Sequence, residues 1–245
     1  MNEREPSSTK PETVLNNIET QKQSQTFKLE KVQKIVESKE TEDLLYCLDV
    51  LEIRAVSIGE GDSAEVFVAE GTPFEKVCLK RIKKNPRVVC NDIDEENDFQ
   101  IKAQEAGVRT PLPLISLQTD RGPCFLMERI DGHSMKDIIK NPELLPKGFK
   151  YDTFFKLLEE QVSIMHKSGL YHRDLHFGNV MINKENLPVI IDFGSAVSGS
   201  GSDFTYEGEV LVYNERSHRY EQKSGTFKDD LKSISELKEQ FIGFK

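Results

Sequence analysis

The feature that most constrains this chain is a pair of polar segments in its second half, His172–Asn179 (HRDLHFGN) and Ile191–Gly194 (IDFG). They place an aspartate, an asparagine and a second aspartate in an order and spacing that suit phosphoryl transfer. In that chemistry one carboxylate orients and deprotonates an acceptor hydroxyl, while magnesium takes hard oxygen ligands beside the nucleotide phosphates. We therefore take Asp174 as the candidate base, and Asn179 and Asp192 as the candidate magnesium ligands.

The segment between the two motifs has the pattern of a hairpin. Apolar runs at 180–182 and 188–191 flank the polar turn Asn183–Asn186, as in two strands joined by a short loop. Such a hairpin would bring Asn179 and Asp192 together at its open end. The competing interpretation is a loop and a hairpin that use aspartate and glycine only for their turns.

HRDLHFGN followed by IDFG resembles the catalytic and metal-binding loops of the protein-kinase-like superfamily. Over about Ile53 to Lys245, the resemblance implies a bilobal α+β fold, in which a five-stranded antiparallel N-lobe sheet and one helix precede a reduced helical C-lobe. It also implies ATP and Mg²⁺ as cofactors. Two further segments are similar to compact members of the superfamily. Glu105–Pro111 (EAGVRTP) resembles a turn of RIO kinases and of the small kinase of the KEOPS complex, and Ile58–Phe67 (IGEGDSAEVF) resembles a loop of OspG-type bacterial effector kinases.

A glycine-containing segment, Ile58–Ala64, joins the strand-like runs 53–57 and 65–69. Glycine lets backbone amides approach phosphate oxygens, although an ordinary hairpin turn has the same composition. The resemblance implies a loop that covers the nucleotide phosphates, and it assigns Val66 to one face of the adenine. The candidate nucleotide contacts in this loop are Ile58, Gly59, Glu60 and Gly61.

Lys80 lies in a third strand-like run, 76–82, among apolar residues. An inward-pointing lysine is costly there unless an anion pairs with it, and the alternation of a strand equally allows it to point outward. The resemblance implies that Lys80 contacts the α- and β-phosphates and a glutamate of the following helix. We expect that helix over Ile93–Ala106, with Gly107 ending it.

Two neighbouring glutamates are candidates for the partner of Lys80. Glu95 shares a helical face with Phe99. Glu96 lies eleven residues before Gly107, which matches the spacing in RIO-type kinases. We therefore take Glu96 as the partner and as a candidate catalytic residue.

By the same resemblance, the chain then enters a hinge between the two lobes. Met127 would lie at the back of the adenine pocket, while the Glu128 carbonyl and the Ile130 amide would bond the adenine edge. Asp131 or Ser134 is a candidate for the ribose, although a turn or a helix cap is an equally good interpretation of both residues.

Two helices are expected in the C-terminal half. Tyr151–Lys167 has the apolar spacing of a buried helix, and Asp229–Phe241 carries an apolar stripe. Asp230 resembles the buried aspartate with which a kinase holds its catalytic loop. We interpret His166 as a cationic or capping side chain near the end of the first helix.

A Gly/Ser-rich segment, 195–202, has the composition of a mobile loop. It resembles an activation segment in position, and Arg173 would be the family's arginine for a phosphorylated loop residue. An unmodified flexible loop is an equally good interpretation. The candidate autophosphorylation sites are Ser198, Ser200, Ser202, Thr205 and Tyr206.

Charge and composition exclude several classes of protein. A net charge of −9 argues against direct nucleic-acid binding. No apolar run approaches the ~18 residues of a membrane span, and the polar N-terminal residues lack the apolar core of a signal peptide. The 4 cysteines have no C-x-x-C spacing, which indicates buried side chains in a reducing compartment. We expect a cytoplasmic protein, with secretion as a bacterial effector left open.

We divide the chain into three parts. Residues 1–26 form a polar tail without fixed structure, and residues 27–51 form a helical extension that packs on the domain or binds a partner protein. Residues 52–245 form a minimal kinase-like domain, with an N-lobe over about 52–130 and a C-lobe over about 131–245.

Three functions compete. The intact DFG sequence and Arg173 favour a serine/threonine protein kinase with a protein substrate. His176 stands where such kinases carry a lysine, and DLHFGN is similar to aminoglycoside- and choline-type kinases, so a small-molecule acceptor such as a sugar or a lipopolysaccharide is the alternative. The third is a pseudokinase that acts as a binding module, against which the complete set of catalytic residue types argues.

Overall fold

The computed structural model describes residues 55–60, 64–70, 76–83, 88–89, 92–119, 122–199, 207–214, 219–226 and 229–242. Contacts within the chain divide it into two units, Met1–Leu48 and Asp49–Lys245, and every described residue lies in the second. The tail expected over 1–26 and the helical extension expected over 27–51 lie outside the described residues. The domain boundaries given above therefore stay predictions.

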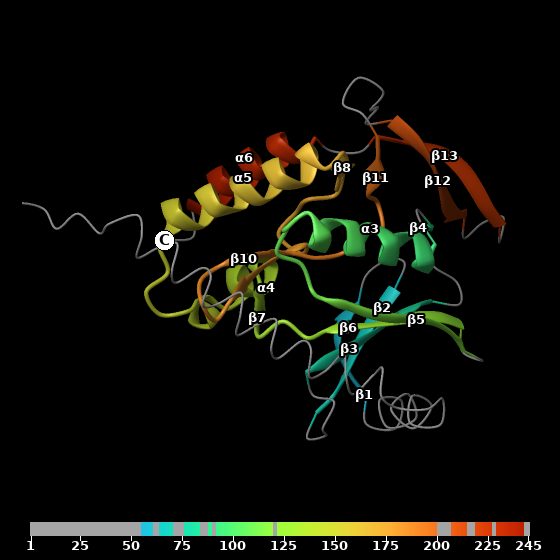
Figure 1. Ribbon diagram of the computed structural model, residues 1–245, viewed down its shortest axis with the longest axis horizontal. Helices are drawn as coiled ribbons and strands as arrows, with labels where there is room; N and C mark the ends of the chain where they lie inside the picture. Colours follow the sequence, from blue (N-terminus) through green and yellow to red (C-terminus); the bar gives the residue numbers. More distant parts are fainter. Residues whose placement is uncertain are drawn as a thin grey trace, which may run out of the picture. The chain divides into compact units, whose positions relative to one another are not determined.

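A five-stranded antiparallel sheet is the first element of the fold (Figure 1), with the strand order β1-β2-β3-β6-β5. The central strand β3 is buried over residues 77–80, because β2 and β6 flank it on both sides. The sheet expected from the resemblance is confirmed. Its strands are β1 (Ala55–Glu60), β2 (Ala64–Ala69), β3 (Val77–Ile82), β5 (Pro113–Thr119) and β6 (Gly122–Glu128).

One helix, α3 (Ile93–Glu105), packs on this sheet. It begins at Asp92, whose side chain accepts a hydrogen bond from the Glu95 amide at 2.8 Å, which satisfies one of the unpaired amides of the first turn. It ends before Gly107, which adopts a φ of +93°, a conformation that glycine takes without steric cost. The helix agrees with the predicted range to within one residue.

One of the two three-stranded sheets among the described residues was not expected from the sequence. The hairpin of β12 (Glu207–Asn214) and β13 (Arg219–Thr226) pairs with the short strand β4 (Val88–Val89), which directly precedes α3. Leu211 is the register partner of Val89. The backbone after the Gly/Ser-rich segment is thus tied to the entrance of α3.

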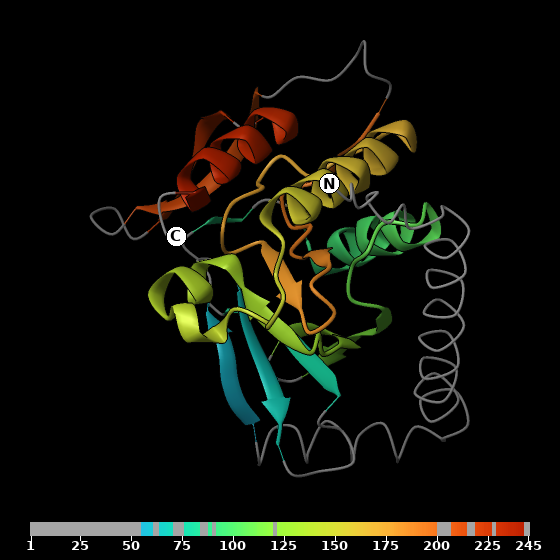
Figure 2. The same cartoon turned by 90° about the vertical axis from the view of Figure 1, so that its left-hand side faces the viewer.

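The remaining elements form the helical part of the fold, in which α5 and α6 lie side by side (Figures 1 and 2). Both helices agree with the predicted ranges, α6 with a shift of one residue. Part of the segment expected as a mobile loop is instead strand β11, which pairs with β8. These elements are β7 (Gly132–Ser134), α4 (Met135–Lys140), η1 (Pro142–Leu144), α5 (Tyr151–Lys167), β8 (Leu170–Tyr171), β9 (Val180–Asn183), β10 (Pro188–Ile190), β11 (Val197–Ser198) and α6 (Asp230–Ile242).

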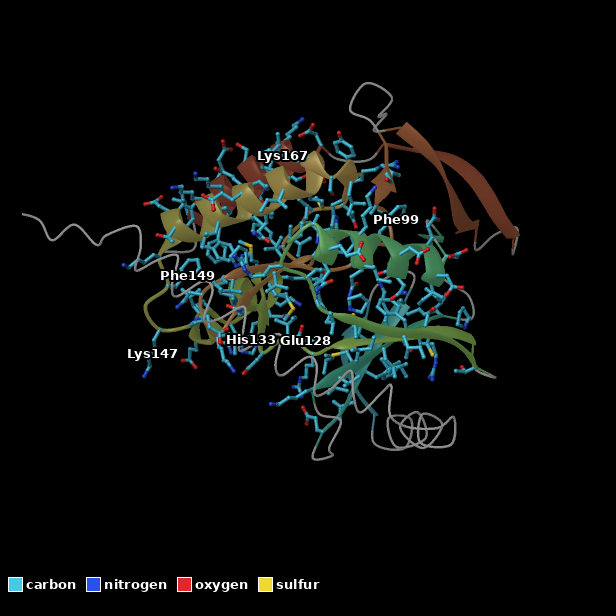
Figure 3. The ribbon with its side chains drawn as sticks, viewed as in Figure 1. Phe99, Glu128, His133, Lys147, Phe149 and Lys167 are labelled. Carbon is cyan, nitrogen blue, oxygen red and sulfur yellow. The ribbon has the colours of Figure 1, made fainter. Side chains whose placement is uncertain are left out.

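An aromatic cluster holds the two long helices together. Phe154 and Phe155 on α5 are fully buried, and Phe155 lies 6.2 Å from Phe241 of α6 between ring centroids. Phe149, which precedes α5 (Figure 3), lies 5.3 Å from Phe154. Burial of these large apolar side chains supplies the main driving force for packing α6 against α5.

In the described part of the chain, none of the helices has the length and apolar character that crossing a membrane requires.

Candidate active site

The centre of the site is a cluster of one amine and two carboxylates. Lys80 Nζ lies 2.5 Å from Glu96 Oε1 and 2.8 Å from Asp192 Oδ1. The Lys80 and Glu96 side chains are almost completely buried, whereas that of Asp192 is 47 % exposed. A buried ammonium is tolerated because anions surround it. The cluster therefore has one inner carboxylate and one that faces outward.

The fold explains why these three residues meet. Lys80 lies on the central strand β3, and Glu96 lies in the first turn of α3, which packs over the sheet. The neighbouring Glu95 is exposed to solvent. The structure thus pairs Lys80 with Glu96 and turns Glu95 away, and the outward-pointing alternative for Lys80 is wrong.

Charge and burial set the protonation of the cluster. Burial would lower the pKa of Lys80, but the charges of Asp192 and Glu96 reverse this effect and raise its pKa above the ordinary value. Burial raises the pKa of Glu96 to about 7, against the opposing pull of Lys80, and the charge of Asp192 adds to the rise. The loss of hydration also acts against charge on Asp192, yet Lys80 outweighs it and lowers the pKa of Asp192 to about 2.

Asp230, a buried aspartate of α6, binds the backbone of the segment His172–Asp174. Asp230 accepts hydrogen bonds from the amides of His172 at 2.8 Å and Arg173 at 2.7 Å. Its Oδ2 also lies 2.9 Å from His166 Nε2. The role that the resemblance implied for Asp230 agrees with these contacts. His166 was interpreted as a cationic or capping side chain, and the structure shows that its ring contacts Asp230.

Asp174 and Asn179 contact each other directly. Asn179 Nδ2 donates to the Asp174 carbonyl at 3.0 Å and lies 3.3 Å from Asp174 Oδ2. The hairpin β9–β10 brings Asn179 beside the second motif, because the Ile191 amide donates to the Asn179 carbonyl at 3.0 Å. The convergence predicted at the open end of the hairpin is therefore present.

The Ile191–Gly194 motif has a left-handed backbone conformation at Asp192 and a buried phenylalanine at position 193. Asp192 has a φ of +66°, and the Gly194 amide donates to its Oδ1 at 3.3 Å. Phe193 is fully buried, with its ring 5.0 Å from that of His172 between centroids. His172 Nε2 lies 3.0 Å from the Ile191 carbonyl oxygen, so His172 is a packing and hydrogen-bonding residue.

Asn179 and Asp192 fit the magnesium site that the resemblance implies. Because the Asn179 amide nitrogen donates to Asp174, the amide oxygen is turned to the other side as a hard acceptor. The half-exposed, anionic Asp192 carboxylate adds a second hard donor. One amide and one carboxylate suit magnesium, which keeps several waters and takes further ligands from phosphates.

The strands that carry the predicted glycine loop place one adenine-contact candidate beside Lys80. Val66 on β2 is the register partner of Lys80 on β3, so both side chains lie on the same face of the sheet. Ile58 on β1 is 48 % exposed. Gly59 and Glu60 lie at the end of β1, and the other residue of the predicted loop set, Gly61, lies outside the described residues.

The hinge candidates lie where β6 ends. The side chain of Gln100 on α3 contacts Met127, and its Nε2 lies 3.9 Å from the Met127 sulfur. The side chain of Glu128 accepts from the Leu112 amide at 3.2 Å, and burial raises its pKa. Figure 3 shows Glu128 and His133 at the passage from the five-stranded sheet to the helical part.

Neither ribose candidate is directed to a ligand by its contacts. Asp131 forms an ion pair with Lys184 at 2.8 Å. Ser134 caps α4, since its hydroxyl accepts from the Asp137 amide at 3.1 Å. The turn and helix-cap interpretations account for both residues.

The sequence motifs did not identify two residues that make clear structural contacts, Gln100 and Lys102. Gln100 is buried and donates to the Pro111 carbonyl at 2.7 Å, and its spacing of four from Glu96 on one helix was the available signal. Lys102 on the same helix donates to Ser198, one of the candidate phosphorylation sites. The candidates Ser200, Ser202, Thr205 and Tyr206 lie outside the described residues.

Comparison with known proteins gives one matching family and several relatives. The family model of the protein kinase domain matches residues 53–212. A probable serine/threonine-protein kinase of Clostridium perfringens is 31% identical over 115 residues, which are 45% of this chain and 16% of the relative. Serine/threonine-protein kinase PknD of Chlamydia caviae is 27% identical over 170 residues, 63% of this chain and 18% of the relative. Sperm motility kinase 2B of Mus musculus is 29% identical over 139 residues, 56% of this chain and 28% of the relative. The chain spans less than a third of the length of these relatives, 16% to 28%.

Proposed function

Because the chain belongs to the protein kinase domain family, we propose that it is an ATP-dependent serine/threonine protein kinase. It transfers the γ-phosphoryl group of ATP to a hydroxyl group of a protein. The names of its relatives support this activity. Within the family we propose a compact type similar to RIO, KEOPS-complex and OspG-type kinases, supported by the Glu105–Pro111 turn with its positive-φ Gly107.

The observation that carries the proposal is the Lys80–Glu96–Asp192 cluster. Its amine is buried, but one of the two carboxylates is half exposed. In this arrangement the Lys80 ammonium stays paired with Glu96, and its other side contacts the phosphate oxygens of a bound nucleotide. Lys80 then offsets negative charge on the phosphates, and Glu96 holds the amine in place. Ile58, Val66, Met127, Glu128 and Ile130, with the loop residues 59–61, are the proposed nucleotide contacts.

Asn179 and Asp192 are the proposed magnesium ligands. When bound, the metal supplies positive charge beside the phosphates and orients them for in-line transfer. The Asn179–Asp174 contacts link the proposed metal ligand to the proposed base. A displacement of the hairpin that carries Asn179 would therefore also displace Asp174.

Asp174 is the proposed base. Its carboxylate orients the acceptor hydroxyl and takes its proton while the hydroxyl oxygen bonds to the γ-phosphorus and the bond to the ADP oxygen breaks. A hydroxyl is a poor nucleophile near neutral pH, so most of the rate is expected from positioning and electrostatics. Lys80, Glu96 and Asp174 are thus the proposed catalytic set.

The acceptor distinguishes the competing functions. A small-molecule kinase remains the second candidate because His176 stands in the DLHFGN segment beside Asp174. The purified protein is incubated with labelled ATP, Mg²⁺ and a generic protein substrate, and separately with sugars and amines. We expect label on protein; turnover that only a sugar or an amine stimulates supports the second candidate. Nucleotide binding without any turnover contradicts both and supports a binding module that acts through the predicted 27–51 extension.

An Asp174→Ala variant tests the assigned base. We expect at least a ~10²-fold loss of transfer with nearly unchanged ATP affinity, because the base acts on the acceptor. Asp152→Ala, at an exposed position on α5, is the matched control and should retain activity. Loss of ATP binding in Asp174→Ala would contradict the role given to this residue.

A further inference from the structure

The imidazole of His176 is held beside the proposed base. Its Nδ1 accepts a hydrogen bond from the Gly178 amide at 2.9 Å. Its Nε2 lies 3.7 Å from Asp174 Oδ2, and both side chains are 48 % exposed. The backbone of the same turn is closed by a bond from the Asn179 amide to the His176 carbonyl at 2.9 Å. The ring is therefore fixed by a local turn and aimed at Asp174.

The Gly178 contact determines the tautomer of this ring. A backbone amide can only donate, so Nδ1 must carry a lone pair and no proton. In the neutral imidazole the proton then sits on Nε2, the nitrogen that faces Asp174. His176 therefore carries its N–H on the nitrogen nearest Asp174, and the 3.7 Å separation is longer than a direct hydrogen bond.

Gly178 also provides the space that the ring occupies. A Cβ atom at this position would lie 2.7 Å from His176 Cε1 and 3.0 Å from His176 Nδ1. Real Cβ contacts are not that short, so any larger residue at 178 would displace the imidazole. The glycine is required here for a close approach, since its φ is not among the positive ones of the described residues.

Two side chains thus lie beside one oxygen of Asp174, Asn179 as a hydrogen-bond donor and His176 at 3.7 Å. Asn179 Nδ2 lies 3.3 Å from Oδ2, and His176 Nε2 approaches the same oxygen. We propose that His176 is a positioning residue that fixes the orientation of the Asp174 carboxylate toward the acceptor hydroxyl, and that Gly178 fixes the tautomer and place of His176. This inference rests on the proposed phosphotransferase function.

The chemistry of this donor differs from that of a lysine. A neutral imidazole offers one N–H in a direction set by its ring, whereas a lysine ammonium carries a full charge and three rotatable donors on a flexible stem. The geometry therefore suits the orientation of a carboxylate more than the neutralisation of phosphate charge. A loss of His176 should accordingly change kcat and leave KM for ATP nearly unchanged.

The first test compares His176→Ala with His176→Gln in a transfer assay that resolves kcat from KM for ATP. We expect His176→Ala to lower kcat by about ten- to a hundredfold, the cost of a misplaced reacting group. Glutamine can present an amide donor in place of Nε2 and should recover part of the loss. A kcat for His176→Ala within about twofold of the wild type, or an equal loss in kcat and ATP affinity, overturns the proposal.

The second test uses the steric link. Gly178→Ala should lower kcat much as His176→Ala does, although the imidazole is still present. In the double variant the added Cβ meets no ring, so its loss should equal that of His176→Ala alone. Gly199→Ala is the matched control, because a Cβ at this exposed glycine meets no atom within 4 Å. Losses that multiply in the double variant overturn the role of Gly178.

A third measurement does not depend on activity. Nitrogen-15 NMR of the full chain reports the tautomer of each neutral histidine, and the signal that disappears in His176→Gln belongs to His176. We expect the proton on Nε2 in the wild type. A ring protonated on Nδ1 overturns the inference even if transfer is robust. A wild type that transfers no phosphoryl group while His176 carries its proton on Nε2 overturns the proposed function and the positioning role, but not the fixed tautomer.

Discussion

Lys80 pairs its one positive charge with two carboxylates, and the difference in their burial gives them different pKa values. Glu96 is the inner partner and loses nearly all hydration, whereas Asp192 remains half exposed. The outer carboxylate therefore ionises easily while the inner one resists ionisation. A cluster with this asymmetry has one carboxylate that holds the amine and another that is accessible to ligands.

The raised pKa of Glu96 predicts how stability depends on pH. Its pKa is about 7 in the folded protein, against an ordinary value of 4.5 for a solvated glutamate. Between these values the folded protein binds more protons than the unfolded chain, so the contribution of Glu96 to the free energy of unfolding falls as pH rises from about 5 to about 8. The lowered pKa of Asp192, about 2 against 3.8, acts only below this range. We expect urea unfolding to show the fall in the wild type and not in Glu96→Gln.

Glu95→Gln is the matched control for this experiment. Glu95 is exposed on the same helical turn, so its loss should leave the difference in stability between the two ends of this pH range unchanged. If wild type and Glu96→Gln depend on pH in parallel, the pKa of Glu96 is not raised in the folded protein.

At the scale of elements, α3 determines whether Glu96 reaches Lys80. Its entrance is capped by Asp92 and tied to β12 through the β4 pairing. Its middle is fastened by Gln100, whose Nε2 donates to the Pro111 carbonyl. Contacts at its start and in its middle thus tie the helix to other segments, in addition to its apolar packing.

Gln100→Ala should therefore destabilise the fold. The substitution leaves the buried Pro111 carbonyl without this donor, and we expect the free energy of unfolding to fall by about 1–3 kcal/mol. Gln104→Ala on the exposed side of the same helix is the matched control, expected within ~0.5 kcal/mol of the wild type. Urea unfolding of both variants decides the matter, and equal stability would show that the Gln100 bond contributes nothing.

The elements also show what could be predicted from the sequence. The range of α3, the hairpin between the motifs and α5 follow from local apolar spacing and from glycine and capping positions, which act within one turn or loop. The choice between Glu95 and Glu96 did not follow from apolar periodicity, because Glu95 shares a face with Phe99 and the buried face of α3 carries the polar residues Glu96, Asn97 and Gln100. The pairing of β12 with β4 joins residues far apart in the chain, and no local pattern encodes that register.

At the scale of the whole described domain, Asp230 links three elements. It lies on α6 with no exposed surface, and it accepts from the amides of His172 and Arg173 and contacts His166 on α5. The sequence indicated Asp230 only through resemblance, because His166 and Asp230 are 64 positions apart and no local pattern pairs them. The Asp230 carboxylate therefore couples the positions of α5 and α6 to that of the segment that contains Asp174.

Asp230→Asn should therefore weaken both the fold and the site. The new amide group presents N–H donors where backbone donors already point, so buried hydrogen bonds are lost and we expect the free energy of unfolding to fall by about 2–4 kcal/mol. Asp229→Asn is a matched control. The Asp229 carboxylate caps the helix start by accepting from the Lys232 amide at 2.8 Å, a role that asparagine fulfils nearly as well. We expect Asp230→Asn to lose transfer as well as stability, and Asp229→Asn to retain both. If the two variants unfold at the same urea concentration, Asp230 does not hold the catalytic segment through a charged, buried contact.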